Sequence, residues 1–434
     1  MHLYSQYFYW LFHCVIYMKQ NIGKELRIIR KYRGLTLREL GKKTGISYSR
    51  LGKFEGGKEM PTNEAVSKIG RVLNVNIEDY LETSREIDIM FNEFLDSLFY
   101  CDDNNDLFKT KIANGKINSI SFSFGKAQLI TYMMCILESK FEKASIMESE
   151  LFEYFKGNYE CEALIYQYKG LIYRMKKYYD KAIECFVRAE MMTINRKNKG
   201  MLYYHSSIVY KDIGNLAKAM QYIEEAHRIF SEYGSLRRVA YCFIEYGLLL
   251  KSNNQYEQAI SQFNIALRAL EMVDCSEALY AKVYRNMCWT MILAGDYKRG
   301  LEYLEEAKEI EPKHGFTVLY AIWCNYKLQN YQEAERWIEA NIDLYNNVEY
   351  GSFYELFDLL VKCREGVPSA KSVKLVTKII EDFKQGEEYE RVNFYIDIAL
   401  DLLNRSGNEL EKIKYLEMKV NLTKGRLFVS TQDI

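Results

Sequence analysis

The chain has 434 residues, too many for one ordinary small domain, and its 48% hydrophobic and 27% charged residues are the balance of a globular protein. Its three prolines are too few to interrupt long helices, so the composition favours an all-α fold. The formal net charge is zero, but residues 19–81 carry 14 Lys and Arg against 7 Asp and Glu, and the rest carries 45 against 52. A basic N-terminal module joined to an acidic body is expected when one end of a protein binds nucleic acid.

Several chemistries are absent from the sequence. The ten cysteines form no CxxC pair and the five histidines have no ligand spacing, which indicates reduced thiols in a cytoplasmic protein and no metal site. There is no P-loop, dinucleotide fingerprint, HExxH motif or nucleophile elbow. We therefore expect no cofactor and no enzymatic activity.

Residues 1–18 carry no charge and many aromatic side chains. They lack the positive start and small-residue cleavage site of a signal peptide. Two interpretations remain: translation begins at Met18, so that this segment is a non-native or disordered extension, or the segment is a short membrane anchor. We favour the first and expect no membrane partner.

Residues 22–81 have the pattern of five short helices. Ile22, Leu26 and Ile29 recur at helical spacing until Gly34. Thr36 and Glu39 form a capping box that begins a second helix.

A turn at Lys43–Ser47 follows, in which Gly45 allows two helices to cross. Ser47 caps a third helix over 48–54, and two more are expected over 63–73 and 77–81.

The run from Leu35 to Ser47 (LTLRELGKKTGIS) resembles the helix-turn-helix of phage-repressor, or XRE-type, domains. At the family's spacing it is followed by Leu51, the run from Phe54 to Lys58 and Pro61. The resemblance covers about 60 residues and implies a DNA-binding domain over residues 19–82.

The resemblance also implies individual roles. Tyr48, Ser49 and Lys53 would face base edges from the recognition helix, and Ser47 and Arg50 would contact phosphate. Arg38 and Lys42 would add charge along the phosphate backbone.

The alternatives to these roles stay open. Tyr48 could pack instead of reading a base, and Lys24, Lys31 and Lys68 could simply be solvated. The family often has a phosphate-binding Gln at the position of Leu37, so that contact is missing here. Arg30 and Glu55 match a structural ion pair of the family. The core of the domain is predicted to contain Leu40, Ile46, Leu51, Phe54, Ile69 and Leu73.

Residues 83–110 are predicted to link the DNA-binding domain to the body through a helix over 86–100 and a polar loop over 101–106. Asp102, Asn104 and Asp106 in the loop weakly suggest a calcium site. The required Gly and terminal Glu are absent, so we reject this site.

The body repeats a short motif that begins with an aromatic or leucine residue and ends in Ala or Gly three positions later. The motif begins at Phe141, Tyr179, Leu216, Tyr256, Tyr297 and Tyr331. Small residues recur twelve positions before the Ala or Gly in four units (Gly170, Ser207, Gly247 and Cys288) and seven after it in four (Ala189, Ala226, Ala266 and Ala307).

Tetratricopeptide (TPR) repeats place small residues at these positions so that two antiparallel helices can approach closely. The sequence therefore predicts a right-handed TPR-like solenoid over residues 111–424, clearest between Ala163 and Pro312. Residues 351–424 are expected to form one or two divergent repeats and a capping helix.

A repressor-like domain followed by such repeats resembles the peptide-responsive regulators of Gram-positive bacteria, the group of Rap, Rgg, NprR, PlcR and PrgX proteins. The order of modules is most similar to NprR or RstA-type regulators. The resemblance implies a homodimeric transcription regulator that binds an inverted-repeat operator. It also implies control by a short signalling peptide in the concave groove, as in quorum sensing, sporulation or virulence.

The repeat register implies which side chains face the groove. Amides would bind the peptide backbone, Arg and Lys a carboxylate, and aromatic rings the side chains. The expected set is Gln167, Arg174, Tyr204, Lys211, Arg285, Asn286, Trp289, Tyr320 and Trp323. With 37 tyrosines in the chain, an aromatic at helical spacing is more often a core residue.

The alternative function is a repeat body that acts mainly by binding a protein, such as a sporulation response regulator. The chain has no Rap-type N-terminal helical bundle, which lowers the expectation of phosphatase activity on such a partner without excluding it.

Overall fold

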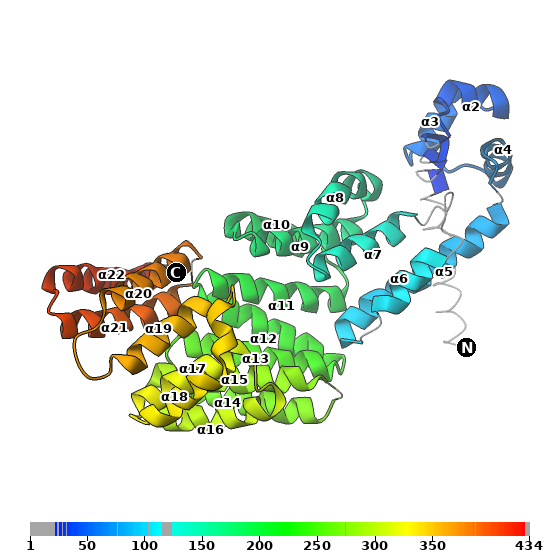
Figure 1. Ribbon diagram of the computed structural model, residues 1–434. Helices are drawn as coiled ribbons and strands as arrows, with labels where there is room; N and C mark the ends of the chain where they lie inside the picture. The colour runs from blue at the N-terminus through cyan, green and yellow to red at the C-terminus, as the bar shows by residue number, and fades with distance from the viewer. Residues whose placement is uncertain are drawn as a thin grey trace. The chain divides into compact units, whose positions relative to one another are not determined.

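The protein, described here from a computed structural model, consists of α-helices and one short 3-10 helix, with no β-strand among the described residues (Figure 1). The structure describes residues 22, 23, 26, 27, 29–31, 33–75, 77–102, 105–114, 124–273, 275–386 and 388–429. The predicted all-α fold is confirmed. The expectation for residues 1–18 lies outside the described residues.

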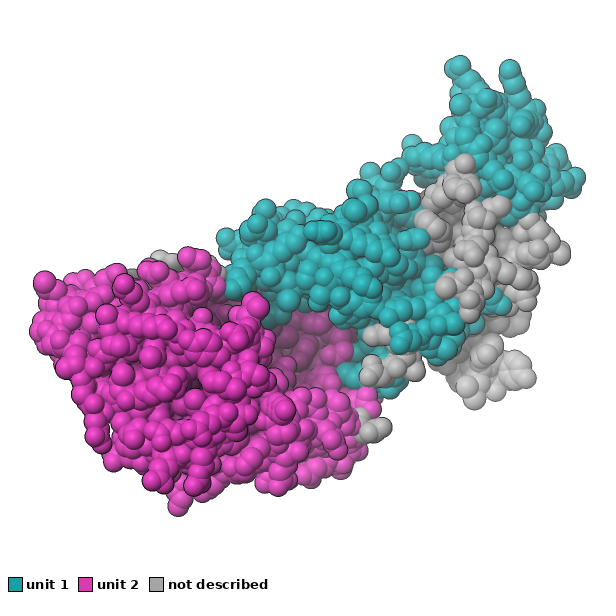
Figure 2. All heavy atoms as spheres, viewed as in Figure 1, with its two compact units in different colours: residues 1–198 teal, residues 199–434 magenta. Residues whose placement is uncertain are grey.

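The chain divides into two compact units, residues 1–198 and residues 199–434 (Figure 2). The division lies in α11 (Arg196–Asp212), within the repeat array. The domain bounds suggested by the sequence, with a linker over residues 83–110, stay predictions.

The helix-turn-helix is formed by α2 (Leu37–Thr44) and α3 (Tyr48–Glu55), followed by α4 (Asn63–Leu73). The predicted capping box is present, because Glu39 N–H donates to Thr36 Oγ1 and Thr36 N–H donates to the Glu39 carboxylate at 2.7 Å. The backbone N–H of Thr36 is the main reason that the pKa of Glu39 is lowered. Gly45 ends α2 in the left-handed conformation, with φ of 72°, as the predicted turn requires.

A small apolar core holds this domain together. Its buried members are Ile22, Leu26, Ile29, Leu40, Leu51, Phe54, Val66, Ile69 and Leu73. Five of the six predicted core residues are among them, and Ile46 packs against the cluster half-buried.

The predicted ion pair is bidentate. Arg30 Nε and Nη2 donate to the two Glu55 carboxylate oxygens at 2.7 and 2.8 Å, and Nη1 donates to the carbonyl of Leu35. The pair therefore ties the first helical segment to α3.

The prediction of a short fifth helix and a separate linker helix was wrong. Residues Ile77–Tyr100 form one helix, α5, that continues through the expected break at residue 82. No proline or glycine lies in this stretch, so nothing in the backbone ends the helix there. The expected loop is also shorter than predicted, because α6 (Asn105–Asn114) already begins at Asn105.

The repeat array begins with α7 (Phe124–Leu137). The first helices of the following pairs are α9 (Tyr159–Met175), α11, α13 (Leu236–Ser252), α15 (Glu277–Ala294) and α17 (Gly315–Lys327). The second helices are α8 (Phe141–Phe155), α10 (Tyr179–Met192), α12 (Leu216–Glu232), α14 (Tyr256–Glu271), α16 (Tyr297–Ile310) and α18 (Tyr331–Ala340). Every second helix begins at the residue that the motif predicted.

The turn inside each of these pairs has a residue with positive φ two positions before the second helix. These residues are Ser139, Lys177, Gly214, Asn254, Gly295 and Gln329, with φ between 59° and 79°. Only two of the six are glycine, so this common turn geometry supports the repeat register independently of the motif that predicted it.

The small residues lie where the paired helices approach. A Cβ on Gly247 would lie 2.5 Å from the ring of Phe263, and one on Gly170 would lie 3.0 Å from the ring of Phe186. The alanines of the motif and those seven positions later are 0% exposed. Close packing of each helix pair thus explains the repeat pattern.

The C-terminal part contains η1 (Ile342–Asn346), α19 (Gly351–Lys362), α20 (Ala370–Gln385), α21 (Tyr389–Ser406) and α22 (Glu409–Val429). Its apolar side chains belong to one core cluster that begins at α15, so the last helices continue the array. This agrees with the expected divergent repeats and capping helix.

Candidate DNA-binding helix and ligand pocket

The side chains expected to contact DNA lie on and beside α3. Arg38, Lys42, Ser47, Tyr48, Ser49, Arg50 and Lys53 are all exposed, whereas Leu51 and Phe54 on the same helix are 1% exposed. Tyr48 is 57% exposed, which favours a contacting role over packing.

Two interactions stabilise the N-terminal end of α3. Ser47 Oγ accepts a hydrogen bond from the backbone of Arg50 and caps the helix, which leaves its hydroxyl proton available to a phosphate oxygen. The guanidinium of Arg38 on α2 lies 5.8 Å from the ring centroid of Tyr48.

Arg50 forms an ion pair with Glu59 at 2.7 Å, so a phosphate would have to compete with this carboxylate. Leu37 packs, half-buried, against the domain core. Its side chain therefore replaces a phosphate contact of the family with a packing contact.

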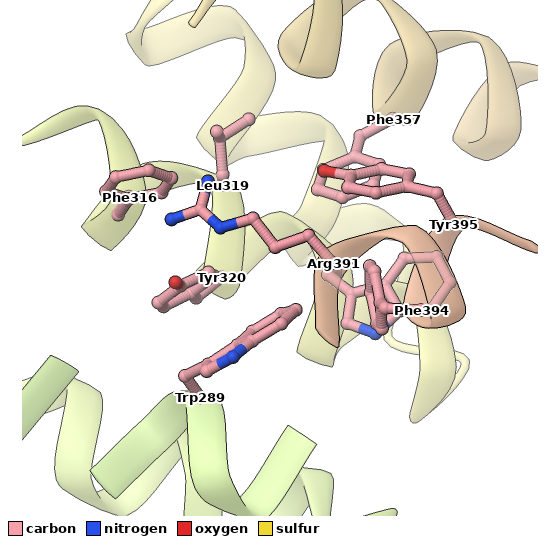
Figure 3. Close-up of a pocket in the computed structure, with 9 residues that line it drawn as sticks. Trp289, Phe316, Leu319, Tyr320, Phe357, Arg391, Phe394 and Tyr395 are labelled. Carbon is pink, nitrogen blue, oxygen red and sulfur yellow. The ribbon is translucent and has the colours of Figure 1, made fainter. Parts of the chain in front are cut away.

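The second site is an aromatic pocket between four helices of the second unit (Figure 3). Its floor is buried and its rim is partly exposed. The floor consists of Trp289, Leu319, Trp323, Phe357 and Tyr395, and the rim of Phe316, Tyr320, Arg391 and Phe394.

The spacing of residues on two helices creates this pocket. On α17, Phe316, Tyr320 and Trp323 are four and three residues apart, so they share one face. On α21, Arg391 and Tyr395 are likewise one turn apart. Trp289 stacks on Tyr320 at a centroid distance of 5.3 Å.

The carboxylate of Glu390, on α21, forms hydrogen bonds with a side chain of the pocket and with a buried lysine. Glu390 Oε1 accepts hydrogen bonds from Trp289 Nε1 at 2.7 Å and from Lys251 Nζ at 2.8 Å. Lys251 is 8% exposed, so this buried cation depends on Glu390 for its counter-charge. The contact joins α13, α15 and α21.

The structure brings together only part of the expected groove set. Trp289, Tyr320 and Trp323 line the pocket. Arg285 is close to the pocket, because its charge lowers the pKa of Tyr320. Burial has the larger effect and raises that pKa overall. Asn286 is half-buried beside Arg285 on α15.

Lys211 and Tyr204 lie apart from this pocket, on α11. Both interact with Glu245, to which Lys211 donates at 2.5 Å. Arg285 is similarly paired with Glu311 at 2.5 Å. These two cations, which we expected to hold a carboxylate, already have carboxylate partners within the protein.

Gln167 does not line an open groove, contrary to the sequence-based expectation. It is 2% exposed on α9, because a position that faces the neighbouring helices can be fully covered by them. Arg174, also on α9, is half-buried.

The sequence reasoning missed six residues of the pocket, which are Phe316, Leu319, Phe357, Arg391, Phe394 and Tyr395. Residues 351–424 were predicted only as generic helices, so the last four of these side chains were not identified. The one available signal was the run from Arg391 to Tyr395, in which a cation and two aromatics share a helical face.

No cluster of metal-ligating side chains is present among the described residues. In the same part of the chain, no helix is both long and apolar enough to cross a membrane.

Two family models match the chain. The helix-turn-helix model matches residues 26–80, and the soluble NSF attachment protein model matches residues 136–313. The second match covers the residues in which the repeat pattern is clearest.

A curated relative is the transcriptional activator NprA of Geobacillus stearothermophilus, which is 21% identical over 203 residues. The match covers 44% of this chain and about half the length of that relative. The chain is therefore similar, over less than half of its length, to a transcriptional activator.

Two solved structures share the fold of this chain. The Rap protein complexed with Competence and Sporulation Factor has a TM-score of 0.62 at 16% identity, and covers 80% of this chain and 99% of its own. NprR in complex with its cognate peptide NprX has a TM-score of 0.56 at 16% identity, and covers 78% of this chain and 99% of its own.

Proposed function

We propose that this protein is a sequence-specific DNA-binding transcription regulator controlled by a short signalling peptide that binds to its repeats. The observation that carries the proposal is the exposed, basic recognition helix α3 on a capped helix-turn-helix, joined to an array with the fold of peptide-bound NprR. The similarity to NprA, which is named a transcriptional activator, supports the role in transcription.

The seven exposed residues of the helix-turn-helix divide into two roles. Tyr48, Ser49 and Lys53 project from the recognition helix and would read base edges in the major groove. Ser47 and the cations Arg38, Lys42 and Arg50 would contact phosphates, which position the protein and make binding sensitive to salt.

A homodimer on an inverted-repeat operator fits these contacts, because two-fold symmetry presents two recognition helices to two half-sites. The outer face of α22 supports a second copy as the partner. Leu410, Ile413, Leu416 and Val420 recur at helical spacing there and are 42–85% exposed. An exposed row of apolar side chains at this spacing is typical of a surface that packs against another helix.

The regulatory peptide would bind to the repeats. The pocket around Trp289, Tyr320 and Trp323 is the best-supported contact region, and Tyr204, Lys211, Arg285, Asn286 and Arg174 remain proposed contacts beyond it. A peptide that binds one arrangement of the protein more tightly would shift the population between DNA-binding and non-binding states.

The test is selection of bound sequences from random double-stranded DNA with the full-length protein. We expect an inverted repeat to be enriched. The double variant Arg50→Ala with Lys53→Ala should lose about tenfold or more in affinity for it at physiological salt, with a shallower salt dependence. Lys68→Ala is the matched control, because Lys68 is an exposed cation of the same domain and pairs with Glu64 on its own helix.

The outcomes separate the candidate functions. Undiminished affinity of the double variant would refute the recognition-helix assignment. Failure to enrich any sequence, at several salt concentrations, would favour the alternative in which the repeat body acts mainly on a protein partner. A mass measurement should give a dimer for the native protein and a monomer for Leu410→Lys with Ile413→Lys.

A further inference from the structure

Arg50, on the exposed face of the recognition helix α3, is held by an acid of the protein itself. Its Nε donates to Glu59 Oε1 at 2.7 Å. Its guanidinium also lies 5.4 Å from the ring centroid of Phe54, a core residue of the domain. A carboxylate and a ring therefore confine this arginine to one side of α3.

The turn after α3 brings Glu59 back to Arg50, which lies nine positions earlier. The backbone N–H groups of Lys58 and Glu59 both donate to the carbonyl of Lys53, at 2.9 and 3.3 Å. Gly57 has φ of 68°, a left-handed conformation that favours glycine, so this residue allows the turn. Because these bonds fix the backbone of Glu59 against the last turn of α3, its carboxylate stays within reach of Arg50.

The pair is too exposed to be important for folding. The side chain of Arg50 is 53% exposed and that of Glu59 is 33% exposed. Exposed ion pairs of this kind contribute little to the stability of a fold. The domain is held together instead by its apolar core and by the buried pair of Arg30 and Glu55. The consequence of Glu59 therefore lies in what Arg50 binds.

The charge of Arg50 strengthens DNA binding only where it is not already neutralised. Each phosphate that a cation neutralises releases counterions and makes the slope of log K against log salt steeper by about 0.9. This contribution corresponds to about fivefold in affinity at about 0.15 M salt and about fifteenfold at about 0.05 M. Glu59 withholds it, because its carboxylate neutralises the guanidinium and repels an approaching phosphate.

The geometry of the pair makes this effect depend on the DNA sequence. With its Nε bound, the guanidinium keeps one orientation, so its terminal nitrogens can contact a phosphate at one place only. A specific complex fixes the register of α3 and places a phosphate there, whereas the register varies in a non-specific complex. An arginine released from Glu59 would instead follow any nearby phosphate.

We propose that Glu59 is a specificity-determining residue that acts through Arg50 to suppress binding to non-operator DNA. It neutralises the Arg50 guanidinium and holds it in one orientation, so that Arg50 contributes mainly on a sequence that fixes the register of α3. Glu59 is thus a positioning residue and needs no DNA contact of its own. This inference rests on the proposed function, because it concerns how the same recognition helix discriminates between sequences.

The test measures the affinity of the full-length protein for two labelled duplexes, by fluorescence anisotropy at several salt concentrations. One duplex carries the inverted repeat enriched by selection, and the other contains the same bases in shuffled order. We expect Glu59→Gln to bind the shuffled duplex about fivefold more tightly at about 0.15 M salt, with a slope steeper by about 0.9. Its affinity for the inverted repeat should rise by about twofold or less, so that the ratio of the two affinities falls.

Two further variants assign the effect to the pair. Glu93→Gln is the matched control, because Glu93 is an exposed acid on α5 that pairs with Lys111 at 3.1 Å, and its substitution changes the net charge equally. We expect it to change neither affinity. In an Arg50→Gln background, Glu59→Gln should raise the affinity for the shuffled duplex by less than about twofold, because no guanidinium remains to be released. Circular dichroism melting of each variant checks that it is folded.

Each result separates this inference from the proposed function. If Glu59→Gln leaves the affinity and slope for the shuffled duplex unchanged, or lowers the affinity, Glu59 does not restrain Arg50 and the inference is overturned. Equal gains on the two duplexes, or an equal gain with and without Arg50, would also overturn it. Sequence-specific binding by the native protein stands in all of these cases. If the native protein does not distinguish the two duplexes, sequence-specific binding fails and the inference fails with it.

Discussion

The contact of Glu390 with Lys251 and Trp289 should contribute strongly to the stability of the second unit. Lys251 has a side chain only 10% exposed, and the side chain of Glu390 is 25% exposed. Removing one member of a buried pair costs about 3–5 kcal/mol, because the other charge stays buried alone. Since Glu390 is partly open to water, we expect Glu390→Gln to lower the free energy of unfolding by about 2–3 kcal/mol.

The substitution Glu390→Gln keeps an oxygen that can accept from Trp289, so it tests the charge separately from the hydrogen bond. Lys251→Met should cost only about 1 kcal/mol, because Glu390 remains bonded to Trp289 and partly hydrated. The double variant should be more stable than Glu390→Gln alone, since it no longer contains a buried unpaired ammonium. The free energies of the two single variants would then be non-additive by about 2 kcal/mol.

Urea unfolding followed by tryptophan fluorescence measures these values, because Trp289, Trp323 and Trp337 all lie in the second unit. The exposed pair of Lys308 and Glu305 is the control, and its neutralisation should change the free energy by less than about 0.5 kcal/mol. If the double variant loses the sum of the two single losses, the reasoning that an unpaired buried Lys251 is the main cost is refuted.

Three further predictions follow from burial. Gly247→Ala should destabilise the second unit by about 1–3 kcal/mol in the same urea assay, because the new Cβ would overlap the ring of Phe263; an unchanged midpoint would contradict this close approach. Burial lowers the pKa of His227, so the unfolded state takes up a proton first as the pH falls through 6.5. The unfolding free energy should decrease below that pH, and less steeply in His227→Gln. Burial raises the pKa of the Cys185 thiol to about 11 and that of Cys161 to about 12, so a thiol reagent at pH 8 should label both only after unfolding, as mass spectrometry of the labelled peptides can verify.

The sequence predicted the repeat array well because its determinants are local. A second helix can be located from one aromatic or leucine residue and one alanine, and packing inside a helix pair selects for small residues at fixed spacing. The capping box at Thr36 and Glu39 was predictable for the same reason. The continuation of α5 was harder, since no residue near position 82 either requires or prevents a break.

The pocket was only partly predictable, because the side chains that complete it come from distant parts of the chain. Glu390 reaches residues that are 101 and 139 positions away in sequence. Helical periodicity in residues 351–424 indicated a buried face, but it contained no information on which earlier helix that face would meet. Phe394 and Arg391 therefore could not be placed beside Trp289 from the sequence.

The ion pairs of the array indicate which cations of a repeat sequence are poor candidates for ligand binding. Lys211 and Glu245 are 34 residues apart, and Arg285 and Glu311 are 26 apart, so each cation finds its carboxylate in the same or the next helix pair. In a solenoid, a cation with an acid at such a spacing tends to be neutralised by its neighbour and is a weak candidate for ligand binding. Arg391 is also paired, with Glu388 on its own helix, and its guanidinium packs against the rings of Phe316 and Phe383. A positive charge near the concave face is therefore weak evidence for a ligand contact until its partners within the protein are known.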